Sequence, residues 1–213
     1  MKNRILVLVS FAALVIGVLA ITPSTQAATN PGIDAAFNSK ATNLRVNLNA
    51  LLHEHTVLGG VTLTALYEGN DTTRLEQLMD ANEMKIAALV QSVYGSDKKN
   101  KFVKLWTQHM TEYKNYTLAK KDNDTTKMNS AKTNLQKISK DLGTTLASKN
   151  LKASTITSLM NDHVNGTLAI VDAVAAGNAT DKSNLLKKGF DQAGKFADTL
   201  ARGIILDHSS MFK

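Results

Sequence analysis

The stretch LWTQH at residues 105–109 is the middle copy of a pattern that occurs three times in the chain. The first copy is LLHEH at residues 51–55, and the third is LMNDH at residues 159–163. Each copy closes with a histidine, and these histidines recur at a constant 54-residue interval: His55, His109 and His163. The regular spacing indicates an internal repeat, which sets the frame for the whole chain.

A turn signal follows each histidine at a constant distance. Fourteen positions after each histidine lies a residue typical of a tight turn: Gly69, Asn123 and Gly177. A repeat of this length with one turn in its middle is typical of a helical hairpin, which must pack against its copies to bury its apolar face.

Apolar residues recur at spacings of three and four through six segments, as expected for amphipathic helices. No proline follows Pro31, which favours long uninterrupted helices. The predicted helices cover residues 43–68, 72–95, 96–117, 124–148, 153–176 and 179–205. The sequence therefore predicts an all-α fold, a six-helix up-and-down bundle built from three 54-residue helical-hairpin repeats.

The segment 1–27 has the features of a signal peptide: a basic start, an apolar run and small residues before a cleavage point after Ala27. The predicted organisation is a signal peptide at 1–27, a linker at 28–42, a bundle domain at 43–206 and a tail at 207–213. We expect a secreted or extracytoplasmic protein associated with the cell surface. If the signal segment stays uncleaved, it provides the only membrane attachment that the sequence predicts.

Composition limits the possible chemistry and partners. The chain has no cysteine, which excludes disulfides and thiolate ligands. Its formal charge of +7 remains positive after loss of the signal peptide. Outside the cell this favours an anionic cell-wall polymer or another surface protein over nucleic acid, with Lys127, Lys132 and Lys137 on an exposed face.

The repeated histidines are the candidate metal ligands. Consecutive hairpins make the first, third and fifth helices parallel, so that His55, His109 and His163 would meet if those helices share the core. Three imidazoles with an open fourth position form a known type of metal site. Imidazole suits copper and zinc, and a thioether from Met110 or Met160 would favour copper.

The same histidines also have a purely structural interpretation, because a histidine on an apolar face is often a hydrogen-bonded core residue. Each repeated histidine is preceded by a residue able to accept a hydrogen bond, as outer-shell partners of ligands do: Glu54, Gln108 and Asp162. Adjacent residues do not face each other on a helix, so such support has to cross between helices. His53 and His208 lie outside the register and are expected at the surface.

No enzyme motif is present. The chain has no P-loop, nucleophile elbow or HExxH, and it lacks the Glu-x-x-His motif of di-iron bundles. Histidine acid–base catalysis has no support beyond the presence of the histidines.

Several of these stretches resemble a family of secreted all-helical proteins of Gram-positive bacteria, whose usual patterns are LLxEH, SVYG, LWxxH, DYT and EHV. The matching residues here are LLHEH at 51–55, SVYG at 92–95, LWTQH at 105–109, YT at 116–117 and DH at 162–163. Some members are named automatically after copper amine oxidase, a catalysis that no feature of this chain supports. The resemblance covers residues 43–205.

The resemblance implies a fourth ligand position on the last helix. A His-Met pair of the family falls on Gln192 and Ala193 here, so the implied ligand set is His55, His109, His163 and Gln192. The leading prediction is binding of copper or zinc by an exported bundle. The alternative is a cell-surface or extracellular interaction module whose histidines are purely structural.

Overall fold

The computed structural model describes residues 32, 35–36 and 38–212, which are helical apart from short connections, with no strand in these ranges. The six long helices and one short 3₁₀ helix are α2 (Lys40–Glu68), α3 (Thr73–Tyr94), α4 (Ser96–Lys121), α5 (Thr125–Leu146), α6 (Ala153–Ala175), α7 (Ala179–Asp207) and η1 (Ser209–Phe212).

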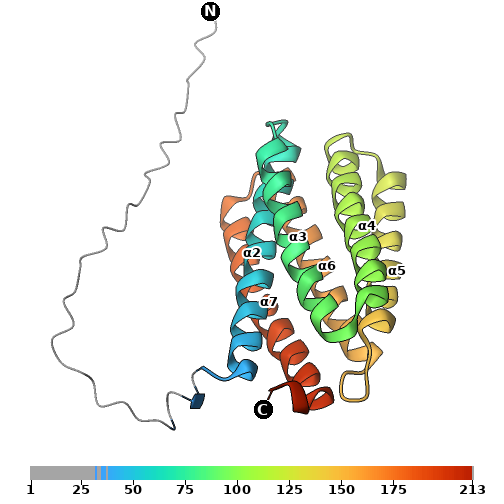
Figure 1. The fold of residues 1–213 in the computed structure, drawn as a ribbon. Helices are drawn as coiled ribbons and strands as arrows, with labels where there is room; N and C mark the ends of the chain where they lie inside the picture. Colours follow the sequence, from blue (N-terminus) through green and yellow to red (C-terminus); the bar gives the residue numbers. More distant parts are fainter. Residues whose placement is uncertain (1–31, 33–34, 37, 213) are drawn as a thin grey trace, which may run out of the picture.

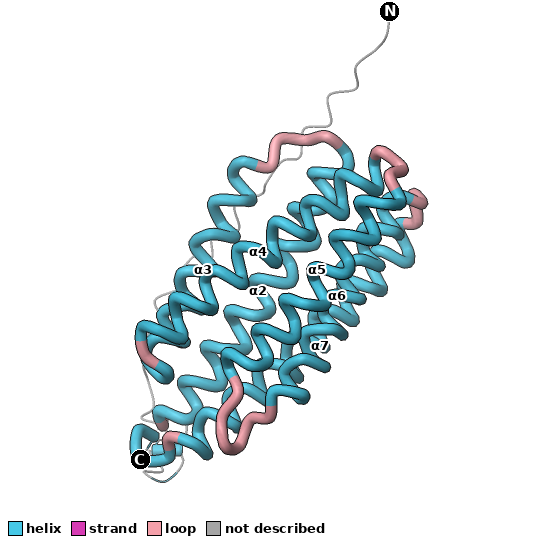
Figure 2. The backbone as a smooth tube through the Cα atoms, turned by 90° about the vertical axis from the view of Figure 1, so that its right-hand side faces the viewer, coloured by secondary structure: helices cyan, strands magenta, loops and turns pink. Residues whose placement is uncertain are grey.

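The helices pack side by side, with the connecting loops at the two ends (Figures 1 and 2). Each helix contacts the next one in the chain, and α7 returns to contact α2. The helices α2, α4 and α6 also contact one another. These three helices carry the repeated histidines, so the packing brings all three copies of the sequence pattern together.

Three turns end their helices in the same way. A residue with positive φ closes each of them: 81° at Gly69, 57° at Asn123 and 66° at Gly177. The amide of the following residue donates to an alanine carbonyl five residues earlier, at 2.8 to 3.0 Å: Asn70 to Ala65, Asp124 to Ala119 and Asn178 to Ala173. This is the Schellman arrangement, in which glycine or asparagine takes the left-handed position. The three turns repeat at the 54-residue interval of the histidines.

Most of the buried apolar side chains in the described part of the chain belong to two clusters. The larger cluster includes Trp106, Leu142 and Phe196. The smaller one includes Tyr113 and Val164. On α2, α4 and α6, the three inner helices, each histidine lies between one residue of the larger cluster and one of the smaller cluster. The pairs, larger cluster first, are Leu52 and Leu63 around His55, Trp106 and Tyr113 around His109, and Met160 and Val164 around His163. The histidines therefore occupy a layer between two apolar regions.

The predicted helix positions agree closely with the structure. The largest differences are at α2, which begins at Lys40 because Ser39 caps it by accepting from the Thr42 amide, and at α4, which continues to Lys121. The tail is also structured, since α7 extends to Asp207 and η1 follows. The predicted signal peptide and about half of the predicted linker lie outside the described residues, and α2 takes up the last three residues of that linker. Within the described part, no helix combines the length and apolar character needed to cross a membrane.

Candidate metal centre

His55 on α2, His109 on α4 and His163 on α6 come together inside the bundle. One nitrogen from each ring lies within 4.8 Å of the other two. The ring centroids are separated by 5.6 to 6.0 Å. The three donor atoms thus lie close together, as the sequence predicts for the case in which these alternate helices share the core.

The cluster is largely shielded from water. His55 is 4% exposed and His109 is 0% exposed, whereas His163 is half-buried. Several ring nitrogens have no hydrogen-bond partner: Nδ1 of His55, both nitrogens of His109 and Nε2 of His163. A buried polar atom without a partner lowers the stability of the fold, so unpaired ring nitrogens indicate a place where a ligand binds.

Burial keeps the imidazoles neutral. It lowers the pKa of His55 to about 3, helped by the nearby His163, and lowers the pKa of His163 to about 4. Burial also moves the pKa of His109 well below its ordinary value, and the other two histidines add to this effect. Neutral imidazole is the form that binds metal ions, so the cluster is ready to coordinate at neutral pH.

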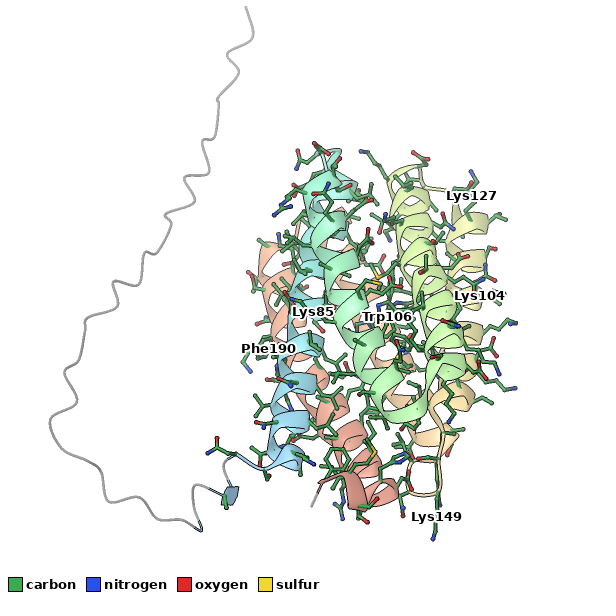
Figure 3. All side chains as sticks on the ribbon, viewed as in Figure 1. Lys85, Lys104, Trp106, Lys127, Lys149 and Phe190 are labelled. Atoms are coloured by element: carbon green, nitrogen blue, oxygen red, sulfur yellow. The ribbon has the colours of Figure 1, made fainter. Side chains whose placement is uncertain are left out.

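Aromatic rings enclose the cluster. The Trp106 ring lies 4.7 Å from that of His55 and 5.3 Å from that of His109, measured between centroids. The Tyr113 ring meets His109 edge-on at 4.5 Å. Trp106 lies at mid-height of the bundle, in contrast to the peripheral Lys127 and Lys149 (Figure 3). These rings exclude water and hold the imidazoles in place by packing.

Asn82 on α3 lies near His55, which belongs to a neighbouring helix. Its amide nitrogen donates to the Leu51 carbonyl at 3.0 Å and to Oε2 of Glu54 at 2.8 Å. Both donor hydrogens are therefore used, and the fully buried Oδ1 is left without a partner, as is Nδ1 of His55. Interaction with the Asn82 side chain acts to raise the pKa of His55, against the effect of burial. A small rotation that brought an Nδ1–H of His55 onto this oxygen would leave Nε2 free to bind a metal.

A small cavity of about 10 Å³ opens beside the cluster, lined by His55, His163, Met160 and Gln192 among others. Gln192 belongs to α7, and its amide nitrogen donates to the Leu159 carbonyl at 2.8 Å. The structure thus places the fourth predicted site residue next to two of the histidines. Whether it coordinates an ion stays a prediction.

The arrangement can hold one ion. Two nitrogens that are each about 2.1 Å from the same ion are at most about 4.2 Å apart. Donor atoms within 4.8 Å of one another therefore need only small side-chain rotations to share an ion. An ion bound among the three rings would have three nitrogen ligands, and Met160 and Gln192 line the cavity beside two of those rings, His55 and His163.

Other predicted site features fall elsewhere. Glu54, Gln108 and Asp162 are exposed, and Glu54 reaches the site only through Asn82. Met110 borders the smaller apolar cluster. His53 is half-buried, and its ring stacks on that of Phe190 with the centroids 3.8 Å apart. His208 is half-buried near Tyr94. Both were expected at the surface, and both are only partly exposed.

The sequence patterns above do not place Asn82 and Tyr113 beside the histidines. The sequence nevertheless contains an indication for each of them. Asn82 is a polar residue inside an otherwise apolar stripe, which marks a buried hydrogen-bonding role. Tyr113 follows His109 by four residues and therefore shares its face of the helix.

Comparison of the chain with protein-family models, with curated proteins and with solved structures finds no match.

Proposed function

We propose that this protein is an exported helical bundle that binds a transition-metal ion, copper or zinc, through His55, His109 and His163. The observation that carries the proposal is the proximity of three neutral imidazoles, two buried and one half-buried, each with at least one ring nitrogen that lacks a hydrogen-bond partner. Core histidines with a purely structural role are expected to have such partners.

Repetition of a hairpin in an up-and-down bundle is the proposed origin of the site. It is supported by the shared 54-residue spacing of the histidines and of the three Schellman turns. Repetition explains why one ligand appears on each of three inner helices. The resemblance to secreted helical proteins of Gram-positive bacteria belongs to the same hypothesis, since three of its motifs contain the clustered histidines.

Calorimetric titration with copper and with zinc tests the proposal. The tag-free chain from Ala28 to Lys213 contains every described residue, and we expect it to bind one ion. His109→Ala should abolish this binding with little change in helix content. His109→Leu, which fills the space with an apolar side chain of similar size, should also abolish it and guards against loss of the fold.

The matched control is His53→Ala, which removes an imidazole from the same helix as His55 but outside the cluster. Its binding should equal that of the unaltered chain. Absence of saturable binding in the unaltered chain, or equal binding in His109→Leu, would refute the proposal.

The alternative function, a surface interaction module, then becomes the working hypothesis. Its candidate lysines are exposed, but Lys127 and Lys137 pair with Asp124 and Asp141 at 3.1 and 2.8 Å, which reduces the charge that they offer to a polymer. Salt-sensitive retention on isolated cell walls would support it, and retention that is unchanged by salt would count against it.

A further inference from the structure

We propose that the three-histidine cluster selects copper in its monovalent state, and that the Met160 thioether is the fourth ligand. This inference rests on the proposed function and specifies the ion and the donor set of the same site.

The ligands of the site carry no charge. Among the described residues, the group able to hold a metal consists of three imidazoles and contains no carboxylate. Neutral ligands leave the full charge of the ion uncompensated. The energy of placing an ion in a medium of low dielectric constant rises with the square of its charge, so a divalent ion is penalised more strongly than a monovalent one.

The surroundings of the cluster are apolar on one side. Trp106 and Met160 line both the small cavity at the cluster and a larger cavity of about 40 Å³. The larger cavity is lined by apolar side chains and by Tyr94, so it offers few of the polar contacts that an ordered water needs. The site therefore borders a dry region of low dielectric constant. Such surroundings strengthen the preference for the monovalent ion.

Met160 offers the fourth donor. It is 1% exposed and lies three residues before His163, on the same face of α6. It lines the cavity that His55 and His163 also line. Thioether sulfur is a soft ligand that favours Cu(I), whereas zinc accepts nitrogen and oxygen donors readily.

The other candidate for the fourth position is the side-chain oxygen of Gln192. Its amide nitrogen is held by the Leu159 carbonyl, so the oxygen is the atom left for an ion. An oxygen donor would favour zinc over Cu(I). The two candidates thus predict different metals, which allows one experiment to separate them.

The experiment is a competition titration of the tag-free chain from Ala28 to Lys213. Cu(I) is measured anaerobically under a reductant against a Cu(I)-specific chelator, and Zn(II) against a zinc indicator. We expect Cu(I) to bind more tightly than zinc, because the donor set is uncharged and includes a soft thioether. Met160→Leu should weaken Cu(I) binding about tenfold or more, with little change for zinc, since losing a ligand costs at least as much as losing outer-shell support.

Met110→Leu is the matched control. It makes the same substitution next to His109, on a side chain that borders the smaller apolar cluster. Leucine replaces methionine with little change in volume, so both variants should fold, which circular dichroism checks. X-ray absorption of the Cu(I) complex should show a copper–sulfur contribution in the unaltered chain and in Met110→Leu, and none in Met160→Leu.

Three outcomes would overturn the inference: tighter binding of zinc than of Cu(I), equal Cu(I) affinity in Met160→Leu, or loss of affinity in Gln192→Leu without loss in Met160→Leu. In each case the proposed function survives, because the histidines still bind a metal. Failure of the unaltered chain to bind either ion would refute the proposed function itself and this inference with it.

Discussion

The histidine layer and the larger apolar cluster beside it both fill the interior of the bundle, but with different kinds of side chain. The apolar cluster fills its space with side chains such as Leu142 and Phe196, which need no polar partner. The histidine layer instead buries ring nitrogens without hydrogen bonds, at a cost to stability. A bound ligand would pair with these nitrogens and recover the lost stability, which explains this arrangement best.

This comparison predicts that acid destabilises the histidine layer before it affects the apolar cluster. The pKa of buried His55 is about 3, below its ordinary value of 6.5, so the unfolded chain binds more protons between these values. Stability is therefore fully present above about pH 6.5 and is lost as the pH falls toward 3, by on the order of 4 kcal/mol from this residue. His163 adds less than its pKa alone suggests, because it is half-buried. Far-UV circular dichroism of the metal-free protein against pH measures the transition.

The control for the acid transition is His109→Leu, which removes one titrating group from the layer. Its acid midpoint should move to lower pH, whereas His53→Ala should leave the midpoint unchanged. An acid midpoint that is the same in His109→Leu would show that the histidine layer does not govern acid stability.

The second prediction targets the apolar cluster alone. Leu142 is 1% exposed, and Leu142→Ala should lower the free energy of unfolding by about 2–5 kcal/mol, because it leaves a cavity in the core. Metal affinity of the folded protein should stay within about threefold, since the substitution removes no ligand. Urea unfolding and calorimetric titration measure the two effects. A large loss of affinity would mean that the two regions are energetically coupled.

The third prediction concerns the outer support of the histidine layer. Asn82→Leu removes the oxygen facing His55 and should weaken metal binding by about 10–100-fold. Nitrogen NMR of the metal-free protein should show His55 protonated at Nδ1 in the unaltered chain and a mixture of tautomers in the variant. Asn49→Leu is the control, because Asn49 bonds to Asp198 rather than to the cluster. A His55 tautomer that is unaffected by Asn82→Leu would contradict this role.

The smallest effect is expected from filling the larger cavity. Val90 borders the cavity of about 40 Å³, and Val90→Ile adds one methylene to it. We expect a gain of about 0.5–1 kcal/mol in the free energy of unfolding and unchanged metal affinity. The shift of the urea midpoint measures the gain. A loss of stability would show that the space is too narrow for the added group.

The two regions also differ in how far the sequence predicts them. Periodicity places the helices within a few residues, since a stripe at spacings of three and four reports which face is buried. The 54-residue spacing places His55, His109 and His163 at one level. Contacts across helices, such as that of Asn82 with His55, depend on the rotation of each helix about its axis, which a single sequence does not specify. The position of Gln192 beside the cluster came from the resemblance, and its role as a ligand stays a prediction.

The placement of one histidine on each inner helix has a consequence for chain topology. An ion held by His55 and His163 would close a loop that spans two whole repeats, and His109 would divide that loop into two equal halves. A covalent cross-link over about 100 residues removes on the order of 4–5 kcal/mol of chain entropy from the unfolded state. A chain without cysteine would thus obtain from one ion the kind of long-range staple that other proteins obtain from disulfides, and would release it whenever the ion leaves.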